Sequence, residues 1–285
     1  MPTPPAKIEI SDTYPNPSSA TARLGFGRLW ETLFGTGGLL GSTGNASDAR
    51  AALGFGVIAQ RNRIINGNFA INQRVVSGTV VLAAGVYGHD RWKAGASGCT
   101  YTFSTTGLDT TITISAGSLQ QVIESVNVEG GNYVMTWTGT AQGRIAGGSY
   151  AATGVAATGV TAAATLTVEF NTGTLTRVQV EPGASGGASP FDRRLMAAEL
   201  ALCQRYYETG VGRFAGYGSG VCQYEIGFKA TKRATPTLVY ASISATNVST
   251  FDARNPTVNS LTWYCVVTVT AGFVWDGTWT ASAEL

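Results

Sequence analysis

Ser189-Pro-Phe-Asp-Arg-Arg-Leu-Met-Ala-Ala-Glu-Leu-Ala-Leu-Cys-Gln-Arg-Tyr-Tyr-Glu208 is the one long helical pattern in a chain that otherwise alternates like β structure. Ser189 is suited to cap a helix, Pro190 to occupy its first position, and Asp192 to complete a variant of the capping box. The pattern therefore predicts a helical stem over residues 189–208.

Apolar residues recur on two faces of this predicted helix. The two stripes are Leu195, Ala198 and Leu202, and Met196, Leu200, Cys203 and Tyr207. A surface helix needs one stripe, so two stripes indicate burial on more than one side. Two interpretations stay open: a helix clamped between two β domains of one chain, or a stem packed against copies of itself. In the second case the trimer stem would be formed by Leu195, Leu202, Tyr206 and Tyr207.

The composition is typical of a turn-rich β protein. Charged residues make up 13% of the chain, and Gly accounts for 37 of its 285 residues. An average soluble domain has about 25% charged residues and about 7% Gly. The net charge of +2 is too small to indicate binding to nucleic acid or to an anionic membrane. We expect no signal peptide, because Met1 to Ile10 lacks both a basic start and an apolar core. We expect no membrane insertion, because no apolar run approaches ~18 residues.

The four cysteines are Cys99, Cys203, Cys222 and Cys265. They are scattered, without the close spacing of a metal site or a disulfide framework. We therefore expect reduced thiols, most of them buried.

Residues 1–60 are expected to form an extended segment and linker instead of a domain. A plausible short helix there carries an apolar patch, which consists of Leu24, Phe26, Leu29, Trp30, Leu33 and Phe34. A segment this short cannot bury the patch alone, so we expect it to dock on another protein or to fold back on its own domain. A two-turn helix is expected over residues 48–53.

From residue 62 the hydrophobic period changes to two. Strands of a first domain, residues 61–188, are expected at 75–83, 99–104, 110–115, 119–126, 133–138, 165–171 and 175–181. Short alternating runs of this kind predict a mainly β fold, here a β-sandwich or jelly roll. A small C-terminal β domain, residues 209–285, is expected from strands at 221–230, 237–244, 261–270 and 273–281.

Several motifs resemble tail fibre proteins of tailed bacteriophages. The motifs are Arg61–Arg74, Tyr87–Trp92, Val178–Gly183, Ser189–Arg194, Ala198–Tyr207 and Phe228–Thr237, with a linker-like Asn45–Gly54 before them. The resemblance implies a homotrimeric adhesin of the virion, assembled in the host cytoplasm. Its middle domain would be similar to carbohydrate-binding jelly rolls. Its N terminus would dock on a phage tail or baseplate protein. The resemblance does not extend to residues 1–44, so the anchor residues Leu29, Trp30, Leu33 and Phe34 are taken from the apolar patch described above.

Related jelly rolls often hold calcium on a carboxylate that directly follows the Phe of an Asn-x-Phe turn. Here Ala70 follows Phe69, although Asn68, Asn72 and Glu181 offer oxygen atoms. We therefore expect no metal and no other cofactor.

Catalytic patterns are weak. His89 stands beside Asp90, but neighbouring residues on a strand point to opposite faces, and no nucleophile-elbow motif occurs. We expect His89 in a turn or on the surface. Acidic residues are sparse for the paired carboxylates of a glycan depolymerase, so we expect no enzymatic activity.

The C-terminal domain is rich in aromatic residues, and exposed aromatic rings suit the apolar faces of sugars. The candidate receptor-binding residues are Trp263, Tyr264, Trp275 and Trp279. Asp276-Gly277 predicts a two-residue hairpin, with Trp275 in the core and Trp279 on the opposite face. There Trp279 is available either to a receptor or to a neighbouring chain in a trimer interface.

The expected function is attachment to a host surface glycan or pilus. The alternatives are a structural fibre or head-decoration component that carries another adhesin and, less favoured, a depolymerase.

Overall fold

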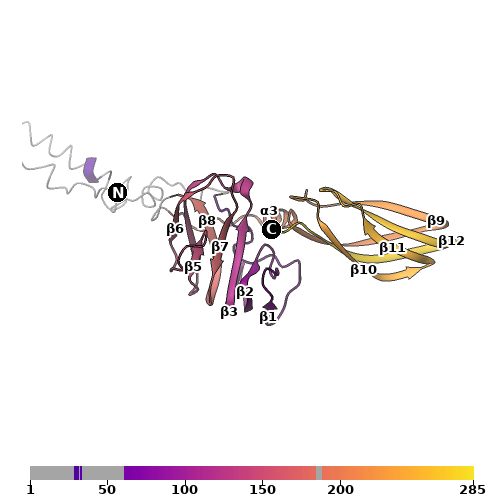
Figure 1. Cartoon of the computed structure of the whole chain (residues 1–285), viewed down its shortest axis with the longest axis horizontal. Helices are drawn as coiled ribbons and strands as arrows, with labels where there is room; N and C mark the ends of the chain where they lie inside the picture. Colours follow the sequence, from indigo (N-terminus) through magenta and orange to yellow (C-terminus); the bar gives the residue numbers. More distant parts are fainter. Residues whose placement is uncertain (1–28, 32, 34–60, 184–187) are drawn as a thin grey trace, which may run out of the picture.

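The computed structural model describes residues 29–31, 33, 61–183 and 188–285. It is mainly β, and the described ranges contain two antiparallel sheets with helix α3 (Met196–Gln204) between them in the chain (Figure 1). No helix in these ranges has the length and apolar character needed to cross a membrane. The expected helix over residues 48–53 lies outside the described residues.

The first sheet is formed by eight strands. They are β1 (Val80–Leu82), β2 (Lys93–Thr106), β3 (Asp109–Ile123), β4 (Gly131–Thr138), β5 (Gly143–Ile145), β6 (Val155–Val160), β7 (Leu166–Phe170) and β8 (Gly173–Pro182). A short 3-10 helix, η2 (Ser125–Asn127), follows β3. The order is β1-β2-β3-β8-β4-β6, and β5 pairs with β7, which also pairs with β3.

Strand β3 divides the first sheet into two layers. Its residues Ile112–Ile114 pair with β8, whereas Leu119–Ile123 pair with β7. The side chains between the layers form one large core, with Trp92 and Phe170 fully buried. The sequence pattern predicted the alternating strands of this core, but it divided β3 into two and missed β5 and β6.

The second sheet is formed by four strands. They are β9 (Tyr207–Gly227), β10 (Thr237–Thr246), β11 (Val248–Arg254) and β12 (Ser260–Ser282). Strand β12 pairs with β9 along one edge and with β10 and β11, one after the other, along its other edge. The sequence pattern missed β11 and the first half of β9, and it divided β12 into two strands.

The second sheet folds back on itself. Trp263 and Trp275 are twelve positions apart on β12, and in a straight strand they would be separated by about 40 Å. Their ring centroids are instead 4.1 Å apart and their planes are 8° apart. The two halves of β12 therefore face each other across a shared core, and we call this folded sheet, residues 207–282, the lobe.

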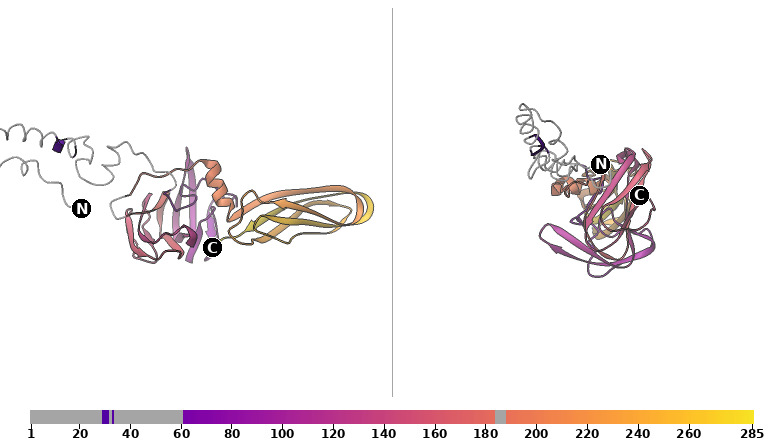
Figure 2. Two further views of the ribbon diagram at one scale, coloured as in Figure 1. Left: turned by 90° about the horizontal axis from the view of Figure 1, so that it is seen from above. Right: turned by 90° about the vertical axis from the view of Figure 1, so that its left-hand side faces the viewer.

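All strands of the lobe bend at the same end, far from the first domain (Figure 2). There β9 passes through Gly220, whose φ is +96°, and β10 meets β11 at Asn247, whose φ is 57°. The pairing of β12 with β9 shifts between Val267 and Ala271. Asn247 Nδ2 donates to Gly272 O at 2.7 Å, which fixes the bend. We call this end the tip; it comprises residues 217–221, 243–249 and 266–273.

Glycines on β9 make room for the aromatic core of the lobe. A Cβ on Gly210 would lie 2.4 Å from Trp279 Cζ2, and a Cβ on Gly212 would lie 2.9 Å from Trp263 Cε2. Real Cβ atoms do not come as close as 2.4 Å to a ring carbon, so a side chain at Gly210 would force the indole of Trp279 to move.

The predicted hairpin at Asp276-Gly277 is wrong. Both residues lie within β12, where Gly277 pairs with Gly212 on one side and with Ser242 on the other. A Cβ on Gly277 would lie 2.9 Å from Trp263 Cζ2. This glycine therefore serves close packing of a tryptophan and does not form a turn.

Candidate binding surfaces

The segment before α3 is bound by the first domain. Ser189 Oγ donates to Glu181 Oε2 at 2.8 Å, and Asp192 N–H donates to Gln179 Oε1 at 2.6 Å. Helix α3 begins only after Leu195, which has no side-chain capping bond. The prediction that Ser189 caps a helix over 189–208 is wrong, because Ser189 and Asp192 bind side chains of β8 instead.

The outer face of α3 is apolar. Its exposed residues are Leu195, Met196, Ala197, Ala198 and Ala201. The side chain of Leu195 is 82% exposed. Glu199 is the one charged residue of α3, but it points inward, where it accepts a hydrogen bond from Asn66 N–H and pairs with Arg194 at 3.2 Å. The outer face therefore presents no charge to its surroundings.

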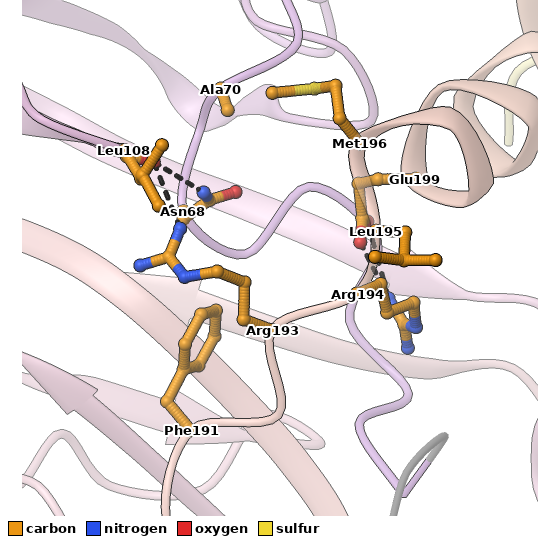
Figure 3. Close-up of a pocket in the computed structure, with 9 residues that line it drawn as sticks. All are labelled: Asn68, Ala70, Leu108, Phe191, Arg193, Arg194, Leu195, Met196 and Glu199. Atoms are coloured by element: carbon orange, nitrogen blue, oxygen red, sulfur yellow. Dashed lines mark hydrogen bonds and ion pairs between the residues drawn. The ribbon is translucent and has the colours of Figure 1, made fainter.

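A hollow of about 220 Å³ lies beside the start of α3 (Figure 3). Its lining includes Ala70, Leu108, Phe191, Leu195 and Met196. The arginine and asparagine groups in the wall are already bonded. Arg193 and Asn68 both donate to Leu108 O, at 3.0 and 2.9 Å. Arg193 also pairs with Asp109. With these polar groups occupied, the hollow is suited to an apolar side chain.

A second hollow, of about 330 Å³, lies where α3 meets the first domain. Ile65, Ala198 and the half-buried Leu202 line it, together with Asn62 and Arg63. The two predicted seam residues on the helix, Leu195 and Leu202, thus both border a hollow.

The other two predicted seam residues contact the first domain of the same chain. Tyr206 is 1% exposed; its ring lies 3.6 Å from the guanidinium carbon of Arg91, and its hydroxyl donates to Glu124 at 2.7 Å. The ring of Tyr207 lies 3.8 Å from the guanidinium carbon of Arg74. Tyr206 is therefore not available to a neighbouring copy, which corrects its assignment to the seam, and one face of Tyr207 is already occupied.

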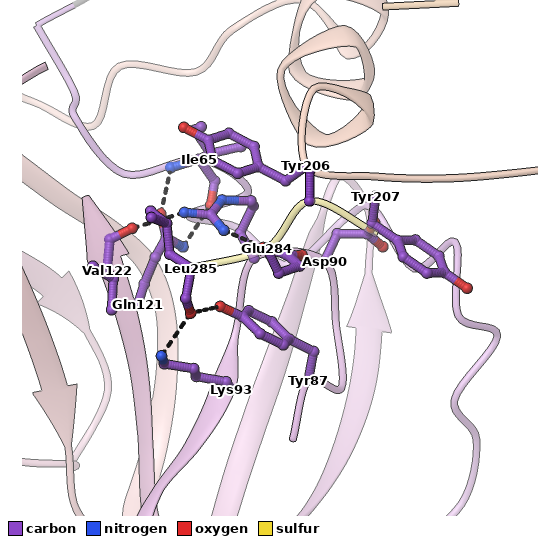
Figure 4. A network of polar contacts seen from close by, with 12 residues as sticks. Ile65, Tyr87, Asp90, Lys93, Gln121, Val122, Tyr206, Tyr207, Glu284 and Leu285 are labelled. Atoms are coloured by element: carbon purple, nitrogen blue, oxygen red, sulfur yellow. Dashed lines mark hydrogen bonds and ion pairs between the residues drawn. The ribbon is translucent and has the colours of Figure 1, made fainter. Parts of the chain in front are cut away.

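The base of the lobe is fixed to the first domain by a polar network (Figure 4). Glu284 pairs with Arg74 at 3.0 Å and with Arg91, whose side chain is 1% exposed. Lys93 Nζ donates to Leu285 O at 2.7 Å. Glu284 and Leu285, which follow β12, thus bind the same region of the first domain as Tyr206, which precedes β9, and Tyr207, which begins it. Both ends of the lobe lie at its base, and the tip is its free end.

Three of the four candidate receptor-binding residues lie in the core of the lobe. Trp263 and Trp275 are fully buried, and Trp279 is 3% exposed. The prediction that Trp279 is exposed is wrong, because Trp275 and Trp279 share the inner face of one continuous strand. Tyr264 is on the outer face and half-buried, and the guanidinium carbon of Arg254 covers its ring at 3.4 Å.

The exposed apolar and aromatic side chains of the lobe are different residues. On the tip they are Tyr217, Val221, Ile243 and Val269. Tyr217 is 78% exposed and Val221 is 58% exposed. The sequence signal for Tyr217 is the surrounding Gly216-Tyr217-Gly218, which leaves the ring without bulky neighbours along the strand.

The tip carries no charge. Residues 214–224, 234–251 and 255–275 contain no Asp, Glu, Lys, Arg or His, and these three runs include the whole tip. The nearest charged groups along the strands include Arg213, which pairs with Asp276, and Arg254, which pairs with Asp252. A surface of hydroxyl, amide and apolar groups favours an uncharged ligand over an ionic one.

His89 lies in a turn, one of the two positions expected for it, but it is buried and not on the surface. It is 2% exposed, and its Nδ1 lies 2.9 Å from the hydroxyl of Tyr101. Burial lowers the pKa of His89 to about 4. Its neighbour Asp90 accepts hydrogen bonds from Gln73 and lies 3.7 Å from Arg74 NH1. This arrangement supports the fold of the first domain.

Two of the three residues considered for calcium, Glu181 and Asn72, use their oxygen atoms in other contacts. Glu181 pairs with Arg61 at 3.0 Å and accepts from Ser189, while Asn72 Oδ1 accepts from Val76 N–H at 3.0 Å. Within the described ranges, no group of three His, Cys, Asp or Glu residues could hold a metal ion. The residues present do not fit a calcium site.

Comparisons of the chain with protein-family models, with curated proteins and with solved structures find no match.

Proposed function

We propose that this chain is a tail fibre adhesin of a tailed bacteriophage, which attaches the virion to the host surface through the tip of the lobe. The observation that carries the proposal is the tip itself. It is the free end of a lobe whose two chain ends are both fixed at its base, and it exposes Tyr217 and Val221 on a surface without charge. Exposed apolar groups that are not scattered singly mark binding surfaces.

The first domain is proposed to be a jelly roll that spaces the lobe from the virion. Two layers around one core support this assignment. The anchor is proposed in the N-terminal segment. There Leu29, Trp30 and Leu33 are helical and Leu29 is 52% exposed, while Phe34 lies outside the described residues.

Assembly into a homotrimer is proposed through the outer face of α3. The exposed Leu195 gives a side chain to insert, and the apolar hollow beside it gives a place to receive one. The second hollow, which Leu202 borders, continues this surface along α3. Such a head-to-side contact closes into a ring under threefold symmetry. Three tips on one axis would add avidity to a weak single contact.

The proposed adhesin acts without catalysis. Asp109, Glu129, Glu169 and Glu181 each pair with an arginine, which leaves these carboxylates poorly suited to acid–base work on a glycan. The pKa of Asp109 is lowered: burial alone raises it, but hydrogen bonds from Arg193 and Arg177 outweigh that effect.

The proposal is tested with fluorescently labelled full chain and a panel of bacterial cells. An adhesin binds one or a few strains saturably, and unlabelled chain competes. Binding to no strain, or equal unsaturable binding to all of them, favours a structural fibre or head-decoration role. Release of soluble sugar from the cells favours a depolymerase.

A further inference from the structure

Two of the four cysteines lie directly opposite each other in the lobe. Cys222 on β9 pairs with Cys265 on β12 in the antiparallel register. Opposed residues share a face of the sheet, and Cys265 is fully buried while Cys222 is half-buried. Both thiols therefore point into the same part of the core, close to the tip.

The spacing of this pair fits a disulfide. Phe228 N–H donates to Asn259 O at 2.7 Å, which is one of the two bonds of a hydrogen-bonded position in an antiparallel ladder. Cys222 and Cys265 are reached from Phe228 and Asn259 by steps of two residues along each strand, so they also form a pair of the hydrogen-bonded type. The Cα atoms of such a pair are about 5.5 Å apart. Disulfides span about 4.4–6.8 Å between Cα atoms.

The surrounding structure allows the small approach of Cβ atoms that a disulfide needs. Strand β9 is an edge strand that pairs with β12 alone among the described strands. The register of β9 and β12 shifts just beyond the pair, between Val267 and Ala271, where the backbone already departs from a regular ladder. We propose that Cys222 and Cys265 are a disulfide-forming pair that links the returning half of β9 to β12 once the protein meets an oxidant.

The oxidant is a low-molecular-weight disulfide such as oxidised glutathione. Cys222, the more exposed thiol, attacks one sulfur as the thiolate, forms a mixed disulfide and releases one glutathione thiolate. Cys265 then loses its proton and attacks Cys222 Sγ, which releases the second glutathione. The protein loses two protons and two electrons, and one glutathione disulfide becomes two glutathione thiols.

The second step sets the pH dependence. Burial raises the pKa of the Cys265 thiol to about 11. The attacking thiolate is scarce at neutral pH, so closure should be slow there and should accelerate up to tenfold per pH unit. Cys99 and Cys203 do not face another cysteine in the register and stay as thiols.

The test uses the full chain, incubated with oxidised glutathione or with dithiothreitol, then alkylated and digested with trypsin. Cleavage at Arg213, Lys229 and Arg254 separates Cys222, in residues 214–229, from Cys265, in the peptide that begins at Asn255. The expected product after oxidation is these two peptides joined, lighter than their sum by two hydrogens. The oxidised lobe should also melt at least ~5 °C higher, a shift that Cys222→Ser abolishes.

Three results would overturn the proposal. The first is alkylation of both cysteines after prolonged oxidation. The second is a stable glutathione adduct on Cys222 with Cys265 still a thiol. The third is a link between Cys222 residues of two copies. Binding to bacterial cells is measured separately, so failure here leaves the proposed adhesin role unaffected, and the reverse also holds.

Discussion

Trp263 and Trp275 stack face to face although both belong to the same strand, β12. The contact requires the strand to turn back on itself, and the neighbouring strands β9 and β10–β11 bend with it. The lobe is therefore a single sheet folded into two layers, with its aromatic residues inside. The tip exposes Tyr217 and carries no charge, and it is the surface that we propose for recognition.

Two glycines of β9 give a matched test of the aromatic core. Gly210→Ala places a Cβ 2.4 Å from Trp279, whereas Gly227→Ala meets no atom within 4 Å. We predict a loss of about 1–3 kcal/mol of unfolding free energy for Gly210→Ala. For Gly227→Ala we predict little change or a gain of up to about 1 kcal/mol. Urea denaturation followed by tryptophan fluorescence measures both; equal losses would contradict the packing.

The network at the base of the lobe should contribute strongly to stability. Glu284→Ala leaves Arg91, whose side chain is 1% exposed, without its carboxylate partner. A buried charge that loses its partner costs about 3–5 kcal/mol. The control is Asp252→Ala, which removes the partner of the partly exposed Arg254 and should cost less than about 1 kcal/mol. Similar losses in thermal unfolding for both variants would refute a buried network.

Acid should destabilise the first domain through His89. Its pKa is about 4 when folded, below the ordinary 6.5, because burial opposes protonation. The unfolded chain thus binds a proton between pH 6.5 and 4 that the folded chain does not. Unfolding free energy should fall by up to about 1.4 kcal/mol per pH unit as pH decreases through this window. In His89→Gln the slope should vanish between pH 6 and 5; an unchanged slope would show that another group titrates.

The outer face of α3 should determine the oligomeric state. Leu195→Asp places a charge on a side chain that is 82% exposed in the single chain, so it should not unfold the protein. In a trimer the same charge would be buried and unpaired. Light scattering should show a trimer for the original chain and a monomer for the variant, with unchanged circular dichroism. A monomeric original chain, or a trimer that tolerates Leu195→Asp, would exclude this interface.

Much of the mainly β architecture could be predicted from the sequence, because period-two patterns identify half-buried strands. The positions at which the strands and the helix end or bend could not be predicted. Asp276-Gly277 has the pattern of a turn. However, the sequence does not distinguish a glycine that forms a turn from a glycine that makes room for the indole of a tryptophan. Ser189 has the pattern of a helix cap, but its oxygen binds the side chain of Glu181 on β8, eight residues earlier. Such competition depends on how the chain folds, which the local pattern does not show.

The candidate receptor residues show the same limit. Local alternation was expected to place Trp279 outside, and the fold-back of β12 places it inside. The burial of His89 was likewise missed, because its partner Tyr101 lies twelve residues further along the chain, on β2. The absence of charge over 214–224, 234–251 and 255–275 was visible in the sequence, but its meaning depends on the fold that gathers these runs at one end.

The most direct test of the central claim introduces a charge at the tip. Tyr217→Asp and Val81→Asp alter side chains that are 78% and 74% exposed, the first on the tip and the second on β1 of the first domain. Binding of each labelled full-length variant to a bacterial strain that the original chain binds is measured by flow cytometry. We predict that Tyr217→Asp weakens binding roughly tenfold or more, with an unchanged melting temperature, and that Val81→Asp binds like the original chain. Undiminished binding by Tyr217→Asp, or an equal loss in Val81→Asp, would contradict the assignment of the tip as the receptor-binding surface.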